Sequence, residues 1–572
     1  MPLRTKTKLS LIIALFLVAP LVAGADYPGQ KVNFFVDPDY DIYARSQTSA
    51  TLKKISTYLY FYIDDNWWNS QNIEKQNNID SAISDLAVEF DSRIYYTLTS
   101  IYGLEWKPGI DKDERIAVLI HPMKEEAGGY FNSGDEYPKL QNPKSNEKEM
   151  VYLNAQHIDE PIAKSLLAHE FTHLITFNQK DKIHNVSEEI WLNEARAEYA
   201  PTLMGYDNVY KGSNLQNRVE EFLKNPQDSL TEWQNKNADY GVLNLFTQYL
   251  VDHYGVKILA DSLHSSKIGI PSINEALSKN GFTENFSQIF TNFTIAALVN
   301  NCQLGEKYCY SNQNLKDLRI TPQINFLPLV GESVLMVTNL TADWAGNWQK
   351  IIGGKGVLTL EFDGADEVNF KVPYLICDYQ NQCQINSLIL DEKQSGKITL
   401  TDFNKKYASL IIIPSIQSKI SGFDGKEISY PFSVKVTTSE KTEEENEAEL
   451  REQLLAQIDF LQKEIAKVQA QINEILAKRG QLISCQRFDE NLYFGMMGNS
   501  EVRCLQEFLK AQGPENYPEG LITGNFLNLT QAAIIRFQEK YATEILVPLG
   551  LEKGTGFVGE RTRTKINNLI SK

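Results

Sequence analysis

Two histidines four residues apart stand in a helical stretch of the sequence, Ala168-His169-Glu170-Phe171-Thr172-His173. Side chains four residues apart lie one above the other on a helix, so both imidazoles can reach one ion at about 2.0–2.1 Å. A bound metal lowers the pKa of its water toward about 7, and a neighbouring carboxylate can take the proton as the water attacks a carbonyl. The spacing therefore predicts zinc (Zn2+) ligands at His169 and His173 and a general base at Glu170.

A hydrolytic zinc site also needs a third protein ligand and an open position. The next predicted helix carries Trp191-Leu192-Asn193-Glu194, and Glu198 follows one turn later. We predict that Glu194 is the third ligand. Asn193 and Glu198 would support the ligands, and Glu198 would face His169 and fix its tautomer. The alternative is a solvated acidic helix face that binds no metal.

The order H-E-x-x-H and then N-E-x-x-x-E resembles the gluzincin zinc metallopeptidases, the thermolysin-like group, and is most similar to their hyicolysin-like branch. The resemblance covers about residues 30–300 and is strongest at 165–200. It implies an α+β zincin-type domain and an endopeptidase that acts on a protein or peptide substrate. The metzincin pattern does not fit, because Thr176 and Gln179 stand where its Gly and third His belong.

The same resemblance implies a Tyr or His that hydrogen-bonds the oxyanion. Tyr240, at the start of a predicted helix, is our candidate for this catalytic role, with His253 as a weaker substitute. A buried tyrosine that only packs is the alternative for Tyr240. The segment Gly128-Gly129-Tyr130-Phe131 is interpreted either as an edge strand that holds an extended peptide or as an ordinary loop.

These residues need a folded frame, which the sequence places at residues 26–320. Short apolar runs at 115–120 and 150–153 predict strands. Apolar residues recur at helical spacing at 161–199, where Asn185-Val186-Ser187 separates two helices, and again at 240–254. We expect an α+β metallopeptidase domain.

The second half of the chain changes pattern twice. Residues 321–438 alternate with a period of two, which predicts a β-sandwich domain. Residues 439–480 predict an acidic linker and then a coiled-coil helix. That helix would allow a homo-oligomer, or it would fold back on a neighbouring domain. Its 4-3 seam consists of Leu454, Ile458, Leu461, Ile465, Val468, Ile472 and Ile475.

Residues 485–572 resemble peptidoglycan-binding domains. The resemblance rests on the segment 500–509, on the turn Thr523-Gly524-Asn525-Phe526 and on the helix with Phe537-Gln538, and its offsets recur at Thr555-Gly556. Leu527 departs from the family, which has Gly there. The resemblance implies a small α-helical domain with peptidoglycan as its partner. A helical bundle without glycan affinity is the alternative.

The chain has 572 residues, a net charge of −17 and a pI near 5.1, which disfavours nucleic acid as a partner. Arg4, Lys6 and Lys8 precede an apolar run that ends in Ala23-Gly24-Ala25, so residues 1–25 predict a signal peptide, with an uncleaved anchor as the alternative. We expect a secreted protein at the bacterial cell wall or cell surface.

The six cysteines form three close pairs, Cys302/Cys309, Cys377/Cys383 and Cys485/Cys504. Closing neighbouring residues costs the least chain entropy, so we predict three local disulfides. Six reduced cysteines would need a reducing compartment. The function predicted from the whole sequence is an exported zinc endopeptidase attached to the cell wall. The alternative is a wall-attached adhesion or structural protein with a degenerate peptidase domain.

Overall fold

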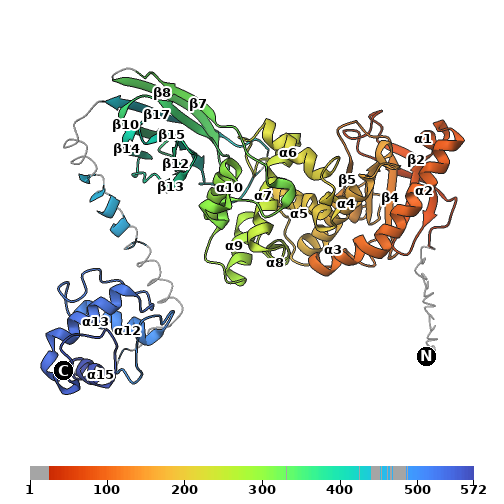
Figure 1. Cartoon of the computed structure of the whole chain (residues 1–572). Coiled ribbons are helices and arrows are strands. Elements are labelled where there is room, and N and C mark those ends of the chain that lie inside the picture. The colour runs from red at the N-terminus through yellow and green to blue at the C-terminus, as the bar shows by residue number, and fades with distance from the viewer. Residues whose placement is uncertain are drawn as a thin grey trace, which may run out of the picture. The chain divides into compact units, whose positions relative to one another are not determined.

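The computed structural model describes residues 25–329, 332–423, 425–439, parts of 451–467, 485 and 487–571. The chain divides into two compact units, 1–441 and 442–572 (Figure 1). Nearly all of the predicted signal peptide and the linker at 440–449 lie outside the described residues. None of the helices within the described ranges combines the length and apolar character that a membrane crossing requires.

The first unit begins with a mixed sheet of six strands in the order β1-β2-β3-β4-β6-β5. Strands β3, β4 and β6 run parallel to one another, β1 and β2 continue the sheet in antiparallel pairing beyond β3, and β5 pairs antiparallel with β6 at the other end. The strands are β1 (Lys31–Phe35), β2 (Gln47–Ile55), β3 (Leu59–Asp64), β4 (Ile116–His121), β5 (Gly129–Phe131) and β6 (Met150–Asn154). The predicted strands at 115–120 and 150–153 correspond to β4 and β6.

Both faces of this sheet are covered, which explains why β3, β4 and β6 are apolar throughout. Successive strand residues point to opposite faces. On β3, Phe61 joins the main core with α2 (Ile73–Glu89), α3 (Tyr95–Tyr102) and α4 (Ala163–Phe177). Tyr62 joins a smaller cluster on the other face, beneath the loops.

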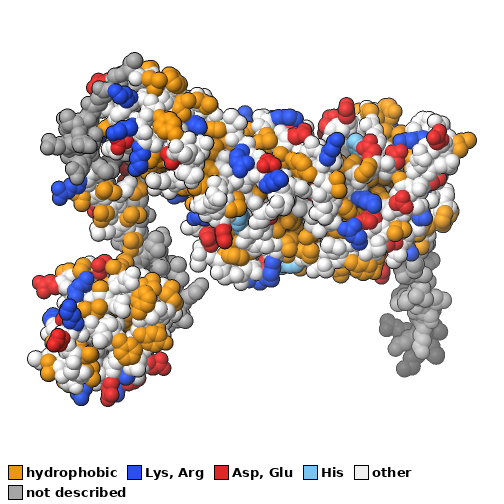
Figure 2. All heavy atoms as spheres, in the orientation of Figure 1, with side chains coloured by type: hydrophobic (Ala, Val, Ile, Leu, Met, Phe, Trp, Pro, Cys, Tyr) orange, Lys and Arg blue, Asp and Glu red, His pale blue; other side chains and the backbone are white. Residues whose placement is uncertain are grey.

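Helices complete this part of the unit and frame the site. The predicted helix pair at 161–199 corresponds to α4 and α5, and the predicted helix at 240–254 lies within α7. The helices after α4 are α5 (Ile190–Leu203), α6 (Asn214–Lys224), α7 (Asn237–Tyr254), α8 (Lys257–Leu263), α9 (Gly269–Lys279) and α10 (Phe286–Val299). On the face shown in Figure 2, acidic and basic side chains are interspersed over this unit.

The region predicted as a β-sandwich forms a mostly antiparallel nine-stranded sheet and a two-stranded one. Its sandwich class stays a prediction. The strands are β7 (Gln323–Leu327), β8 (Ser333–Ala342), β9 (Gln349–Gly353), β10 (Gly356–Gly364), β11 (Phe370–Lys371), β12 (Pro373–Asp378), β13 (Cys383–Ser387), β14 (Ser395–Phe403), β15 (Tyr407–Ile412), β16 (Ser415–Ile416) and β17 (Ser429–Ser439).

The main hydrophobic core of the helices extends into the β-region of the first unit, which also has a core of its own. Trp344 packs edge-on against Phe286 of α10, with ring centroids 4.9 Å apart. Trp348 donates its indole N–H to the carbonyl of Thr294, also on α10, over 2.9 Å. Both tryptophans are only 2% exposed, so the two regions pack against each other through a buried contact.

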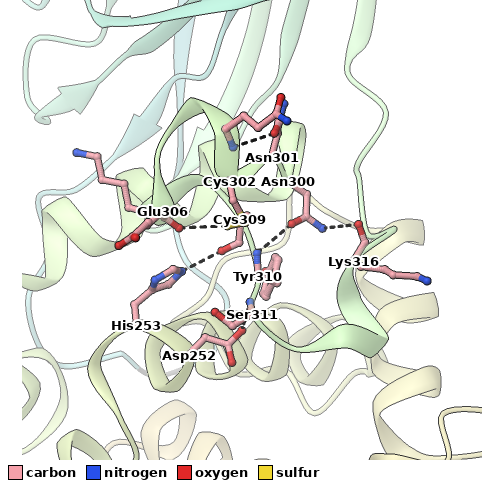
Figure 3. Close-up of a disulfide and its surroundings, with 12 residues drawn as sticks. Asp252, His253, Asn300, Asn301, Cys302, Glu306, Cys309, Tyr310, Ser311 and Lys316 are labelled. Atoms are coloured by element: carbon pink, nitrogen blue, oxygen red, sulfur yellow. Dashed lines mark hydrogen bonds between the residues drawn. A yellow bond between two sulfur atoms is a disulfide. The ribbon is translucent and has the colours of Figure 1, made fainter.

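All three predicted disulfides are present: Cys302–Cys309, Cys377–Cys383 and Cys485–Cys504. The first closes a loop after α10 (Figure 3). There Nε2 of His253 lies 2.9 Å from the carbonyl oxygen of Cys309. His253 therefore supports this loop.

The second unit contains the helices α12 (Ser500–Ala511), α13 (Asn528–Lys540), α14 (Ala542–Ile545) and α15 (Glu560–Ile570). The sequence repeat noted at Thr523-Gly524 and Thr555-Gly556 corresponds to two equivalent hydrogen-bond networks. Gln506 accepts the backbone N–H groups of Thr523 and Gly524 over 2.7 and 2.8 Å. Gln538 accepts those of Thr555 and Gly556 over 2.8 and 3.0 Å. Each glutamine also bonds a threonine hydroxyl 24 positions further on.

Part of the predicted coiled-coil seam lies in this unit. Its described members Leu454, Ile458, Leu461 and Ile465 are helical and between 45% and 53% exposed. The remaining seam residues Val468, Ile472 and Ile475 lie outside the described residues. A single chain therefore leaves the described part of the seam uncovered.

Two buried carboxyl groups, Glu136 and Glu149, face each other near the start of β6. They are 1% and 3% exposed, and no described donor bonds either oxygen of Glu136. Burial and then the charge of Glu149 raise the pKa of Glu136 well above its usual range. Burial raises the pKa of Glu149 to about 7. The pair therefore retains protons that the unfolded chain releases near pH 4.5.

The free energy of unfolding of the parent chain should decrease as pH rises, because of the buried pair. We expect this decrease to be smaller in Glu136→Gln. The folded pair binds more protons than the unfolded chain above about pH 4.5, so its contribution to the free energy of unfolding falls as pH rises toward 7. Melting temperatures between pH 5 and 8 would measure this, in an inactive background. The variant should gain stability over the parent at pH 8 but not at pH 5. An equal shift at both pH values would contradict this, and exposed Glu392→Gln is the control.

Candidate active site

The two histidines of the motif point to one place from α4. Since they are four residues apart, they share one face of this largely buried helix. The Nε2 atoms of His169 and His173 are 3.2 Å apart, and the ring planes meet at 75°. Two ring nitrogens at this separation can bind the same cation.

Glu194 reaches the same place from α5. One of its oxygens lies 3.4 Å from Nε2 of His169, and the other lies 3.7 Å from Nε2 of His173. Ligand atoms at the corners of a zinc tetrahedron are about 3.3–3.4 Å apart, as bond lengths of about 2.0–2.1 Å require. The enclosed oxygen Oε2 of Glu194 also bonds no hydrogen-bond donor among the described residues. These three side chains therefore fit a tetrahedral metal ion.

The pKa shifts of the buried side chains at this place also suit a bound metal ion. Burial lowers the pKa of His173, which favours the neutral ring that binds metals. Burial opposes ionisation of Glu194, but His173 and His169 lower its pKa below the usual value. His169 faces the carboxylates of both Glu194 and Glu198. Burial opposes a charge on His169, but its hydrogen bonds to these two carboxylates raise its pKa to about 10, so this place favours a positive charge.

Glu198 lies behind His169, with one oxygen 3.4 Å from Nδ1 of the ring. Arg218 of α6 holds this carboxylate with two parallel hydrogen bonds of 2.8 and 2.7 Å. Asn214 and Asn244 donate to the same carboxylate over 3.0 and 3.2 Å. Burial opposes the charge, but Arg218 and His169 hold the pKa of Glu198 well below its usual range. Glu198 is thus a fixed anion that orients His169.

Asn193 supports the second histidine. Its side-chain oxygen lies 3.1 Å from Nδ1 of His173, which leaves Nε2 free to face His169 and Glu194. The structure therefore brings together His169, His173, Asn193, Glu194 and Glu198 as the sequence predicts. Arg218, Asn214 and Asn244 belong to no motif, and no sequence signal pointed to them.

Glu170 stands next to the ligand histidines and is 4% exposed. Its Oε2 atom bonds no donor among the described residues. Burial raises the pKa of Glu170 to about 8, with further contributions from Glu194 and Glu198, although His169 opposes the shift. A carboxyl group in this environment can both accept and return a proton near neutral pH.

The edge strand β5 passes close to Glu170. A Cβ atom on Gly129 would stand 2.6 Å from the carbonyl of Tyr152 and 2.9 Å from Oε1 of Glu170. Only glycine fits there. Gly128 and Gly129 also line the cleft that contains His169 and Glu170. The predicted strand therefore borders the site at the end of the sheet.

Two tyrosines line the same cleft, Tyr240 from the first turn of α7 and Tyr40 from the loop after β1. Their hydroxyls lie 3.5 and 3.4 Å from the side-chain amide of Asn235. The guanidinium of Arg218 lies 4.5 Å from the ring centroid of Tyr240. Sequence reasoning missed Tyr40, because its loop precedes the motif by more than a hundred residues. His253 is not among the residues that line this cleft.

A comparison with known proteins gives one relative and no matching family model. The chain is 25% identical over 245 residues to the neutral metalloprotease ShpI of Staphylococcus hyicus. The match covers 38% of this chain and 53% of that protein, so the chain spans about half of its relative's length. The matched relative is a metalloprotease, a class of enzyme that acts with a bound metal ion.

Solved structures add little to this. The lysozyme inhibitor PliG of Aeromonas hydrophila is 11% identical with a TM-score of 0.14, over 20% of this chain and 98% of that one. The copper-binding protein CorA of Methylomicrobium album BG8 is 10% identical with a TM-score of 0.12, over 21% of this chain and 100% of that one. Both TM-scores are too low to bear on fold or function.

Proposed function

We propose that the chain is an exported zinc endopeptidase, attached to the bacterial cell wall by its C-terminal unit. The observation that carries the enzymatic part is the convergence of two Nε2 atoms and one carboxylate within 3.2–3.7 Å. His169, His173 and Glu194 would hold the zinc. When bound, zinc lowers the pKa of a coordinated water and polarises a carbonyl.

The side chains around this place have distinct tasks. Glu170 accepts a proton from the attacking water at its unbonded Oε2 and delivers it to the departing amine nitrogen. Glu198, held by Arg218, keeps His169 in the tautomer whose Nε2 is free. The strand β5 adds an extended substrate peptide to the sheet edge through backbone hydrogen bonds.

The test of this function uses the purified full-length chain. Zinc content is measured together with casein cleavage, before and after dialysis against a chelator and after zinc is added back. We expect cleavage to disappear with the zinc and to return with it. Cleavage that survives the loss of zinc would refute the zinc mechanism. Zinc binding without cleavage of casein or purified cell wall would favour a non-catalytic adhesion protein.

Attachment to the wall rests on the resemblance of residues 485–572 to peptidoglycan-binding domains and on their duplicated glutamine networks. The full chain carrying Glu170→Gln should sediment with purified peptidoglycan, and soluble glycan fragments should release it. Failure to sediment would remove peptidoglycan as the partner. Assays on cell wall beside casein would show whether stem peptides are also cut.

The uncovered seam of the second unit favours self-association through a coiled coil. Leu454, Ile458, Leu461 and Ile465 would pack against a second copy. Sedimentation equilibrium of the full chain should give a dimer or larger oligomer, and Ile458→Glu should shift it to monomer. A monomeric parent chain would contradict the proposal.

We expect Tyr240→Phe to lower kcat by about 10²-fold, the usual effect of losing one oxyanion donor. Tyr40→Phe should cost less than about tenfold. Burial and then the charge of Glu194 raise the pKa of Tyr240 well above its usual range, although Arg218 over its ring opposes the shift, so its hydroxyl keeps the proton that an oxyanion donor needs. The ranking rests on position, because Tyr240 is held in the first turn of α7 whereas Tyr40 lies in a loop. Steady-state kinetics on a fluorogenic peptide measure both variants, and the reverse ranking would assign the role to Tyr40.

A further inference from the structure

A second group of acidic side chains lies in the segment that leads from α6 into the first turn of α7. Asp228, Glu232 and Asp239 each place a carboxylate oxygen within 4.8 Å of the others. Glu232 is 6% exposed, Asp239 is 1% exposed and Asp228 is half-buried. None of them is a predicted zinc ligand, and the group contains neither His nor Cys.

Two buried oxygens of these carboxyl groups accept no hydrogen bond from the described residues. Asp239 uses Oδ2 to accept the backbone N–H groups of Gln234 and Lys236 over 2.8 and 3.0 Å. Glu232 accepts the side-chain amide of Gln234 and the backbone N–H of Glu427. The enclosed atoms Oδ1 of Asp239 and Oδ2 of Asp228 bond no donor among the described residues. A buried acceptor without a donor is costly unless something else binds it.

The nearby cations are engaged elsewhere. Lys236 donates its ammonium to the side chain of Gln234, and Lys419 pairs with Glu427. Burial, and then the charges of Glu232 and Asp239, raise the pKa of Asp228 to about 8. Within the described part of the chain, the charges that act most strongly on Asp228 are those of the other two acids, so three acidic groups share this place without a cation of their own.

We propose that Asp228, Glu232 and Asp239 bind a hard divalent cation of the calcium type. Oxygen-only ligands select such a cation over zinc, which prefers nitrogen and sulfur. Calcium accepts irregular coordination by carboxylates and waters at about 2.3–2.6 Å, whereas magnesium demands near-octahedral geometry. Two of the three acids also hold backbone N–H groups, so their positions are already fixed.

The position of the site gives it a structural task. Asp239 and Tyr240 are consecutive in the first turn of α7, and Trp233 packs on the ring of Tyr240 with centroids 4.9 Å apart. A cation that joins Asp239 to Asp228 and Glu232 fixes the segment that carries Tyr240 into the cleft. This inference does not depend on the proposed zinc chemistry.

The test uses the full chain with Glu170→Gln, which avoids self-digestion, after zinc loading. Calcium should raise the melting temperature, and magnesium at the same concentration should not. Terbium, a luminescent substitute for calcium, should be sensitised by Trp233, and calcium should quench the signal by displacement. Asp228→Asn should weaken calcium binding about tenfold or more, since it removes one of three charged ligands. The exposed Glu392→Gln should leave it unchanged.

Three results would overturn the proposal. They are a melting temperature that calcium leaves unchanged, an equal effect of magnesium, and terbium luminescence that survives in Asp228→Asn. If the three acids merely share protons, Asp228→Asn will raise the melting temperature at pH 8 without any calcium response in the parent. Asp239→Asn provides a second ligand variant. Because the readouts are melting temperature and luminescence, a negative result leaves the zinc assignment untouched.

Discussion

Replacement of Glu170 by Gln is expected to lower kcat on casein by about 10²–10⁴-fold, the range for loss of a general base. Gln has the same shape but cannot accept a proton, and the Oε2 position it takes has no competing partner. Because the proposed role of Glu170 is that of a base and not of a metal ligand, zinc content should stay at the level of the parent chain.

Zinc stoichiometry and steady-state kinetics measure these two effects separately. Glu392→Gln is the control for the loss of one carboxylate at an exposed position. A variant that loses zinc together with activity would show that Glu170 acts on metal binding. Unchanged cleavage would remove Glu170 from the mechanism.

Replacement of Arg218 by Met is expected to destabilise the first unit by about 3–5 kcal/mol, as is usual when a buried charge loses its partner. Glu198 is 1% exposed and would keep the amide donors Asn214 and Asn244 and its contact with His169, but no permanent cation. Met keeps the apolar part of the contact with Tyr240. Weaker support of His169 should also reduce zinc affinity by about 10–100-fold.

Urea unfolding and zinc titration in the Glu170→Gln background measure both effects. The matched control is the double variant Arg218→Met/Glu198→Gln, in which no charge is left unpaired. It should recover much of the lost stability but not the zinc affinity. If Arg218→Met alone costs less than about 1 kcal/mol, the ion pair behaves as a surface pair and does not hold the site.

The zinc-site geometry could be predicted where it depends on local helix periodicity. Two histidines four apart must share a helix face, and Glu194 follows on the next helix. Arg218 could not be predicted, because its meeting with Glu198 depends on how α6 packs against α5 and α7. Tyr40 comes from a loop in the first part of the chain. The roles assigned to these residues stay predictions until the variants are measured.

In the fold, too, local features could be predicted from the sequence, whereas contacts between distant residues could not. The alternation at 321–438 predicted strands, and the close cysteine pairs predicted the three disulfides. The sequence did not indicate that Trp344 and Trp348 enter the helical core. The positions of tryptophans in a sequence do not show which distant residues they pack against. The acidic group at 228–239 escaped notice, since its members are irregularly spaced over a loop and the first turn of α7.

The tryptophans that join the β-region to α10 determine how the protein can be dissected. A fragment cut at residue 320 would lose Trp344 and Trp348 and leave an apolar cavity against Phe286 and Thr294. It would also lose the backbone N–H of Glu427 that holds Glu232. Expression of an autonomous catalytic fragment should therefore fail unless the chain continues to residue 439.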